Sequence, residues 1–157
     1  MNEVNLVTRE TRPTDRPRTI AELVNVLRHP ALILGAAAPE DLEADYDEGD
    51  WAEVPAEIRA ALDHPDHSLE WFVAKLEATA RFLKTHRLRL HGHPWLHVMR
   101  FRDTASISYV LHLDLDSDAA DTWNERFNAV LDAKDLLGGP LYVALRMRGP
   151  LRSRGQD

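Results

Sequence analysis

The spacing of hydrophobic residues predicts helices in the first half of the chain. In the segment that follows Thr19, apolar residues recur every three or four positions, which is typical of an amphipathic helix. Thr19 and Glu22 form a capping box that marks its beginning, and Pro30 marks its end. Residues 55–64 and 69–86 show the same period. The longer of these two segments is apolar on more than one side, so we expect it to lie between two layers of the fold.

After the long predicted helix the apolar period changes from 3.6 to 2, which indicates strands. We expect strands over residues 87–91, 95–102 and 106–115, followed by a helix that Asp118 caps. The segment "LYVALRMR" then alternates as a final strand. This β-β-β-α-β order, with helices before it, predicts an α+β fold in which N-terminal helices pack on an antiparallel sheet.

Three histidines lie close together in "LRLHGHPWLHVMRFR", namely His91, His93 and His97. Imidazoles that converge can bind zinc or iron. Gly92 and His93 suit a two-residue hairpin turn, and that register turns His91 and His97 to opposite faces of the sheet. A three-residue loop would bring these two histidines to one face but would separate the apolar side chains of the two strands. We therefore favour the two-residue turn.

The same register predicts a basic outer face on the sheet. It assigns Trp95, His97 and Met99 to the core, and Leu96 and Val98 to the outer face. An antiparallel sheet can leave one face in water, where arginine binds carboxylates or phosphates through paired hydrogen bonds. The residues that we expect on this face, and expect to bind a partner, are Arg87, Arg89, Arg100, Arg102, Arg146, Arg148 and Tyr142.

The length and composition are those of one globular domain. With 157 residues, 44% hydrophobic and 29% charged, the chain can form its own core. We expect a loosely docked arm over residues 1–18, a single domain over 19–149 and a loose tail over 150–157. The absence of cysteine excludes disulfides and thiolate chemistry. The longest apolar run, "ALILGAAA", is far shorter than the ~20 residues that cross a bilayer, so we expect a cytoplasmic protein without membrane contact.

The net charge of −7 is unevenly distributed along the chain. Residues 40–57 contain nine acidic residues and no basic one, whereas residues 81–102 contain six basic residues and no acidic one. Such asymmetry indicates one of three arrangements: two solvated faces of opposite charge, an acidic segment that folds across the basic face, or charged surfaces that bind a partner. Of the 19 basic residues 16 are arginine, which is typical of a GC-rich bacterial or phage genome.

The sequence contains no phosphate-binding loop, hydrolase elbow or metalloprotease motif, so we expect binding rather than catalysis. We interpret the chain as a non-catalytic regulatory or interaction protein, of accessory or immunity type, without a cofactor. It would bind a protein partner through the basic sheet face, the acidic segment or both. One alternative is a metal-dependent enzyme that uses His91, His93 and His97. A second alternative, RNA or single-stranded DNA binding through the arginine face, is disfavoured by the net charge.

Overall fold

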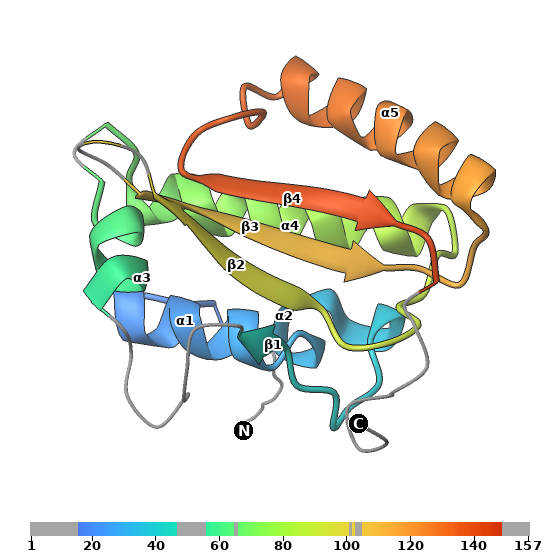
Figure 1. Cartoon of the computed structure of the whole chain (residues 1–157), viewed down its shortest axis with the longest axis horizontal. Helices are drawn as coiled ribbons and strands as arrows, with labels where there is room; N and C mark the ends of the chain where they lie inside the picture. Colours follow the sequence, from blue (N-terminus) through green and yellow to red (C-terminus); the bar gives the residue numbers. More distant parts are fainter. Residues whose placement is uncertain (1–15, 47–55, 65, 101, 103–104, 149–157) are drawn as a thin grey trace, which may run out of the picture.

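A four-stranded sheet with helices along one side organises the chain (Figure 1). The computed structural model describes residues 16–46, 56–64, 66–100, 102 and 105–148, and the account that follows concerns these residues. The elements in chain order are α1 (Ile20–Arg28), α2 (Ala31–Leu34), the 3₁₀ helix η3 (Gly35–Ala37), β1 (Asp45–Tyr46), α3 (Ala56–Leu62), α4 (Leu69–Thr85), β2 (Trp95–Arg100), β3 (Ala105–His112), α5 (Ser117–Ala133) and β4 (Leu141–Arg146).

The longer helices begin where a side chain caps their first turn. The hydroxyl of Thr19 accepts a hydrogen bond from the backbone N–H of Glu22 at 3.1 Å, as the capping box predicts. Ser68 caps α4 in the same way. Asp116, not the predicted Asp118, caps α5 by accepting from the N–H of Ala119 at 2.9 Å. Asp116 has the extended backbone that a capping position requires, whereas Asp118 lies within the first helical turn.

The sheet has the order β1-β2-β3-β4 and is mixed. Strands β2 and β3 pair antiparallel, while β1 pairs with β2, and β3 with β4, in parallel. The last pair is parallel because α5 carries the chain back to the start of the sheet between β3 and β4. The predicted α+β class is confirmed, with helices in the N-terminal half and a strand at the C-terminal end, but the sheet is not antiparallel throughout.

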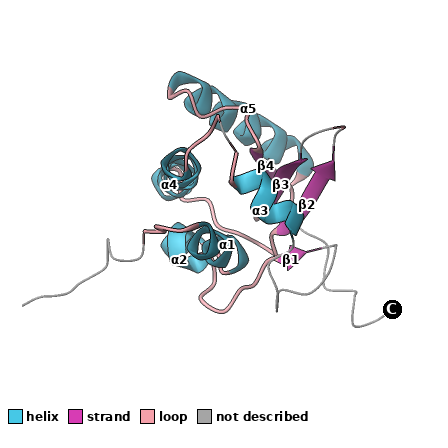
Figure 2. Ribbon diagram, turned by 90° about the vertical axis from the view of Figure 1, so that its left-hand side faces the viewer, coloured by secondary structure: helices cyan, strands magenta, loops and turns pink. Residues whose placement is uncertain are grey.

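Helices α1, α2 and α4 lie on one side of the sheet, α5 runs beside β4, and α3 lies at one end (Figures 1 and 2). The core fills the space between the helices and the strands, with Phe72 of α4, Leu111 of β3 and Phe127 of α5 all fully buried. Each such side chain stabilises the fold by about 1.5–3 kcal/mol. Along the strands, the other face carries no helix among the described residues. We call it the open face.

The predicted hairpin at Gly92 and His93 is wrong. Leu90 bridges Leu113 of the chain that follows β3, and β2 pairs with β3 from Trp95 onward, so the chain keeps one direction along β3. Residues 91–94 lie opposite residues 111–112 and form a bulge instead of a turn.

The bulge also reverses the predicted faces of β2. Leu96 and Val98 are 0% and 2% exposed in the core, whereas Trp95, His97 and Met99 lie on the open face. The chemistry of these side chains is consistent with this arrangement. Leucine and valine have no polar atom to satisfy, while indole and imidazole keep a ring nitrogen near water. In β3 and β4 the alternate side chains that begin with Ile107 and Leu141 are buried, as their alternation predicts, but Met147, which was predicted to continue the core set of the last strand, lies beyond β4 and is 49% exposed.

The predicted arm and tail fall almost wholly outside the described residues. At the described end of the predicted arm, Arg16 pairs with Glu77 of α4 at 2.8 Å. None of the helices in the described ranges is by itself long and apolar enough to cross a membrane. Helix α1 and the segment Ala31–Ala37 meet that test only as a pair bent by 92°.

Candidate functional site

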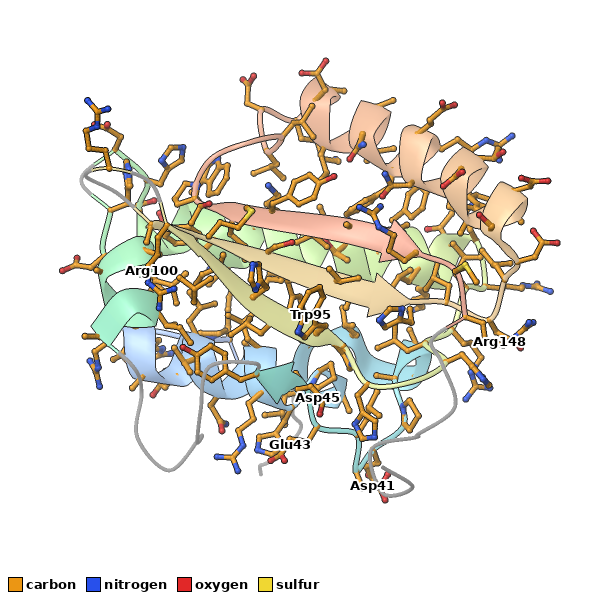
Figure 3. The ribbon with its side chains drawn as sticks, in the orientation of Figure 1. Asp41, Glu43, Asp45, Trp95, Arg100 and Arg148 are labelled. Carbon is orange, nitrogen blue, oxygen red and sulfur yellow. The ribbon has the colours of Figure 1, made fainter. Side chains whose placement is uncertain are left out.

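The arginines predicted to share one face lie at separate places in the fold. Arg87 and Arg89 follow α4 and line a cavity against α2. Arg100 ends β2, at the end of the sheet where α3 lies (Figure 3), and the exposed Arg102 follows it. The face of β2 that carries Arg100 also carries the core residues Leu96 and Val98, because side chains alternate along a strand. The predicted common face is therefore corrected.

Two of the predicted partner-binding residues belong to the open face. Tyr142 and Arg146 alternate with the buried core residues of β4. Arg146 is opposite His112 of β3. Burial lowers the pKa of His112, the carbonyl oxygen of Met147 opposes that shift, and the charge of Arg146 lowers the pKa further. Arg148 lies beyond the strand and pairs with Asp114 at 2.8 Å. The binding role of these residues stays a prediction.

The three histidines of the metal alternative have different partners. The ring Nδ1 of His93 lies 2.7 Å from the carbonyl oxygen of Glu43 and donates to it. The backbone N–H of His91 donates to the carbonyl of His112, and His97 stacks on Trp95 with ring centroids 5.1 Å apart. Across the described ranges, no three His, Asp or Glu side chains are arranged to hold one metal ion.

A row of side chains crosses the open face from one edge to the other. The strand registers align Asp45 with Trp95, Trp95 with Val110, and Val110 with Ala144. Trp95 is 41% exposed, whereas Val110 and Ala144 are buried. The next row places His97, Ser108 and Tyr142 in line. The open face thus presents a band of aromatic rings with one exposed indole.

One acidic side chain, Asp45, lies beside this indole at the β1 edge, and two others lie farther along that edge. Figure 3 shows Asp45 beside Trp95, Glu43 below Asp45, and Asp41 farther along the lower edge of the molecule. We call these three carboxylates the acidic edge. Their position is fixed by the backbone, because the N–H of Asp45 donates to the carbonyl of Pro94 at 2.7 Å and the next residue back, Ala44, donates to the end of α1. Glu43 pairs with Arg28 at 2.6 Å.

Sequence reasoning missed a buried lysine under the sheet. Lys75 of α4 is 0% exposed, and its ammonium donates to the carbonyls of Gly138 at 2.8 Å and Leu141 at 2.6 Å. The indole of Trp71 lies 5.0 Å from the same nitrogen. Burial lowers the pKa of Lys75 to about 8. This lysine fastens the connection that leads into β4, and the only sequence signal for it was a polar position within the apolar stripe of a helix.

The chain was compared with family models, with curated proteins and with solved structures. It matches no family model, and neither the curated proteins nor the solved structures contain a significant match to it.

Proposed function

We propose that this chain is a non-catalytic interaction protein whose open sheet face binds a basic segment of a partner protein. The observation that carries the proposal is Trp95, an exposed indole on a sheet face that carries no described helix, with Asp45 of the acidic edge paired beside it. Tryptophan is a frequent anchor at the centre of protein interfaces. Complementary charge around such an anchor draws the partner and selects it.

The exposed surface of Trp95 sets the scale of the interaction. At 41% exposure, roughly 100 Å² of this side chain remains open to a partner. Burial of that area at about 25 cal/mol per Å² contributes about 2.5 kcal/mol. This free energy corresponds to roughly 50-fold in affinity. Tryptophan at this position is thus large enough to act as the main apolar contact of the interface.

The charge of this region favours a basic partner. Asp45 lies beside the indole, Glu43 and Asp41 lie farther along the acidic edge, and the sequence adds five further acidic residues between positions 47 and 57. Arg28 neutralises one of these carboxylates. Nucleic acid would require a continuous track of cations, and the described arginines do not form one over the open face. The interaction role that we expected from the sequence is retained, and the surface assigned to it moves from the arginines to the acidic edge.

The binding test uses short synthetic peptides in which arginine and lysine flank one leucine, with glutamate versions of the same peptides as the charge control. Isothermal titration calorimetry measures affinity, and the indole N–H resonance of Trp95 reports the site. We expect the basic peptides to bind, the glutamate peptides not to bind, and the affinity to fall with added salt.

Variants connect this binding to the open face. Trp95→Ala should weaken the basic peptide by roughly 50-fold, whereas Leu32→Ser removes a side chain of similar exposure, 48%, from another surface and should leave it unchanged. Asp41→Lys should weaken binding, and Asp132→Lys on α5 serves as its matched charge control. The proposal fails if no basic peptide binds, or if Trp95→Ala and Leu32→Ser have the same effect.

A further inference from the structure

A cavity of about 500 Å³ opens between α2, η3 and the C-terminal half of α4. This volume lies within the range of small-molecule binding sites. Three cationic side chains, Lys84, Arg87 and Arg89, belong to its wall. The apolar residues that form most of its surface include Ile33, Leu34, Ala37, Ala80 and Leu83. The cavity therefore combines an apolar floor with positive charge.

These cations have no ion-pair partner within the described part of the chain. A smaller hollow of about 170 Å³, which Arg87 and Arg89 also line, includes Asp114 in its wall, but that carboxylate is paired with Arg148 at 2.8 Å. In a chain whose net charge is −7, a group of three cations without carboxylates is a local exception. The charge is available to an external anion.

The backbone places one of these cations at some energetic cost. Helix α4 ends in a Schellman motif, in which the N–H of Leu88 donates to the carbonyl of Leu83 and the N–H of Arg87 donates to that of Lys84. The motif requires a left-handed residue, and Arg87 occupies that position with φ 56°. Glycine is the usual residue there because any side chain strains the backbone. Arg87 thus occupies a position where a side chain strains the backbone, as Asp135 does after α5 with φ 59°.

We propose that this cavity binds a small anionic amphiphile, a molecule with one carboxylate or phosphate group and an apolar body. The apolar body fills the floor between Leu34, Ala80 and Leu83, and the anionic group meets Arg87 and Arg89. Guanidinium groups bind carboxylate and phosphate oxygens through paired hydrogen bonds. This site is separate from the open face, and it does not depend on the proposed interaction with a basic partner.

Calorimetric titration with sodium decanoate and with decyl phosphate, each below its micelle concentration, tests the ligand class. Decan-1-ol, decyltrimethylammonium and acetate are the matched probes that lack the negative charge, reverse it or lack the apolar body. We expect at least one of the two anionic amphiphiles to bind about tenfold or more tightly than each matched probe. The proposal is overturned if neither anionic probe binds, or if any matched probe binds as well.

Variants locate the binding. Arg87→Gln together with Arg89→Gln should weaken decanoate about tenfold or more. The matched control, Arg81→Gln together with Lys134→Gln, removes two exposed cations outside the cavity and should have no effect. Ala80→Phe should block the floor. If that variant does not fold, Ala36→Trp on the exposed part of the wall provides the same test. Equal binding by the cavity variants and the control contradicts the site.

A vesicle experiment separates a free ligand from a membrane surface. Vesicles of phosphatidylglycerol present the same anionic chemistry as lipid headgroups. Binding of the protein to these vesicles without binding of either soluble anionic amphiphile overturns the small-molecule proposal. Trp95→Ala should leave decanoate binding unchanged, so a failure at the cavity and a failure at the open face are distinguishable.

Discussion

Because the ammonium of Lys75 is buried, the stability of this protein varies with pH in the alkaline range. Burial lowers the pKa of Lys75 from its ordinary 10.5 to about 8 in the folded chain. At a pH between about 8 and 10.5, the lysine of the unfolded chain still binds a proton that the lysine of the folded chain has lost. The free energy of unfolding therefore rises with pH across this window, because stability increases wherever the unfolded state binds more protons.

The size of the effect follows from the two pKa values. Below pH 8 the lysine is protonated in both states and contributes no slope. From pH 8 to pH 10 the folded state gives up its proton first, and each pH unit contributes about 1.4 kcal/mol at most. The total gain between pH 7 and pH 10 is about 2.5 kcal/mol for the pKa of about 8. The carbonyls of Gly138 and Leu141 also favour the charged form, which makes this figure an upper value.

Above pH 10 a second buried group reverses the slope. Tyr109 is buried, and burial raises the pKa of its phenol. The unfolded tyrosine loses its proton near the ordinary pKa of 10.0, while the folded tyrosine keeps it. Stability therefore falls above pH 10. The expected profile has a maximum near pH 10, with the rise due to Lys75 and the fall due to Tyr109.

Urea unfolding monitored by circular dichroism, repeated at intervals from pH 7 to pH 11, measures this profile. In Lys75→Met the rise between pH 8 and pH 10 should disappear, whatever the absolute stability of the variant. Tyr109→Phe should keep the rise and lose the fall. A wild-type profile that is flat or descending from pH 8 to pH 10, or an unchanged rise in Lys75→Met, would refute the reasoning.

Four substitutions test other parts of the fold by the same unfolding assay. Tyr109→Phe removes a buried hydroxyl that donates to the end of α1 at 2.6 Å, and should cost about 1–2 kcal/mol at pH 7, so an unchanged stability contradicts the role of that bond. Gly139→Ala should cost more than Gly138→Ala, because both glycines have positive φ but only the new Cβ at Gly139 meets Trp71, at 2.6 Å, and equal costs count against that clash. Arg87→Gly should raise the free energy of unfolding by about 1 kcal/mol through relief of the left-handed backbone, and a loss of stability would show that the arginine is not strained.

Local signals in the sequence identified the elements on the helix side of the fold. Thr19 and Pro30 bound α1 as predicted, since a capping hydroxyl and a proline act on the residues next to them. The alternation of β3 and β4 correctly separated core from open face.

Strand β2 shows where such reasoning stops. Gly92 and Pro94 are equally compatible with a turn and with a bulge. Which of the two forms depends on the strand with which the flanking residues pair. Leu90, before Gly92, bridges Leu113 just after β3, and the residues from Trp95 onward pair with β3 itself. The chain therefore continues past Gly92 in one direction. That pairing shifts Leu96 into the core and Trp95 out of it. One choice of partner thus reversed the face of every side chain in the strand.

The candidate sites also combine features that are visible in the sequence with positions that only the tertiary structure decides. The acidic run was visible in the sequence, but only the parallel pairing of β1 with β2 places Asp45 beside Trp95, fifty residues away. The cavity is lined by residues of α2, of α4 and of the turn after α4 that contains Arg87. These segments are not connected by any local pattern in the sequence.

The sequence by itself determined the α+β class, the longer helices with the cap of α1, and the alternation of β3 and β4, because these features arise from neighbours along the chain. Tertiary structure alone decided the pairing partner of β2, the separation of the arginines and the position of the acidic edge. These depend on contacts between distant residues, where the gain from burial of Leu96 and Val98 outweighs any preference expressed by the turn sequence.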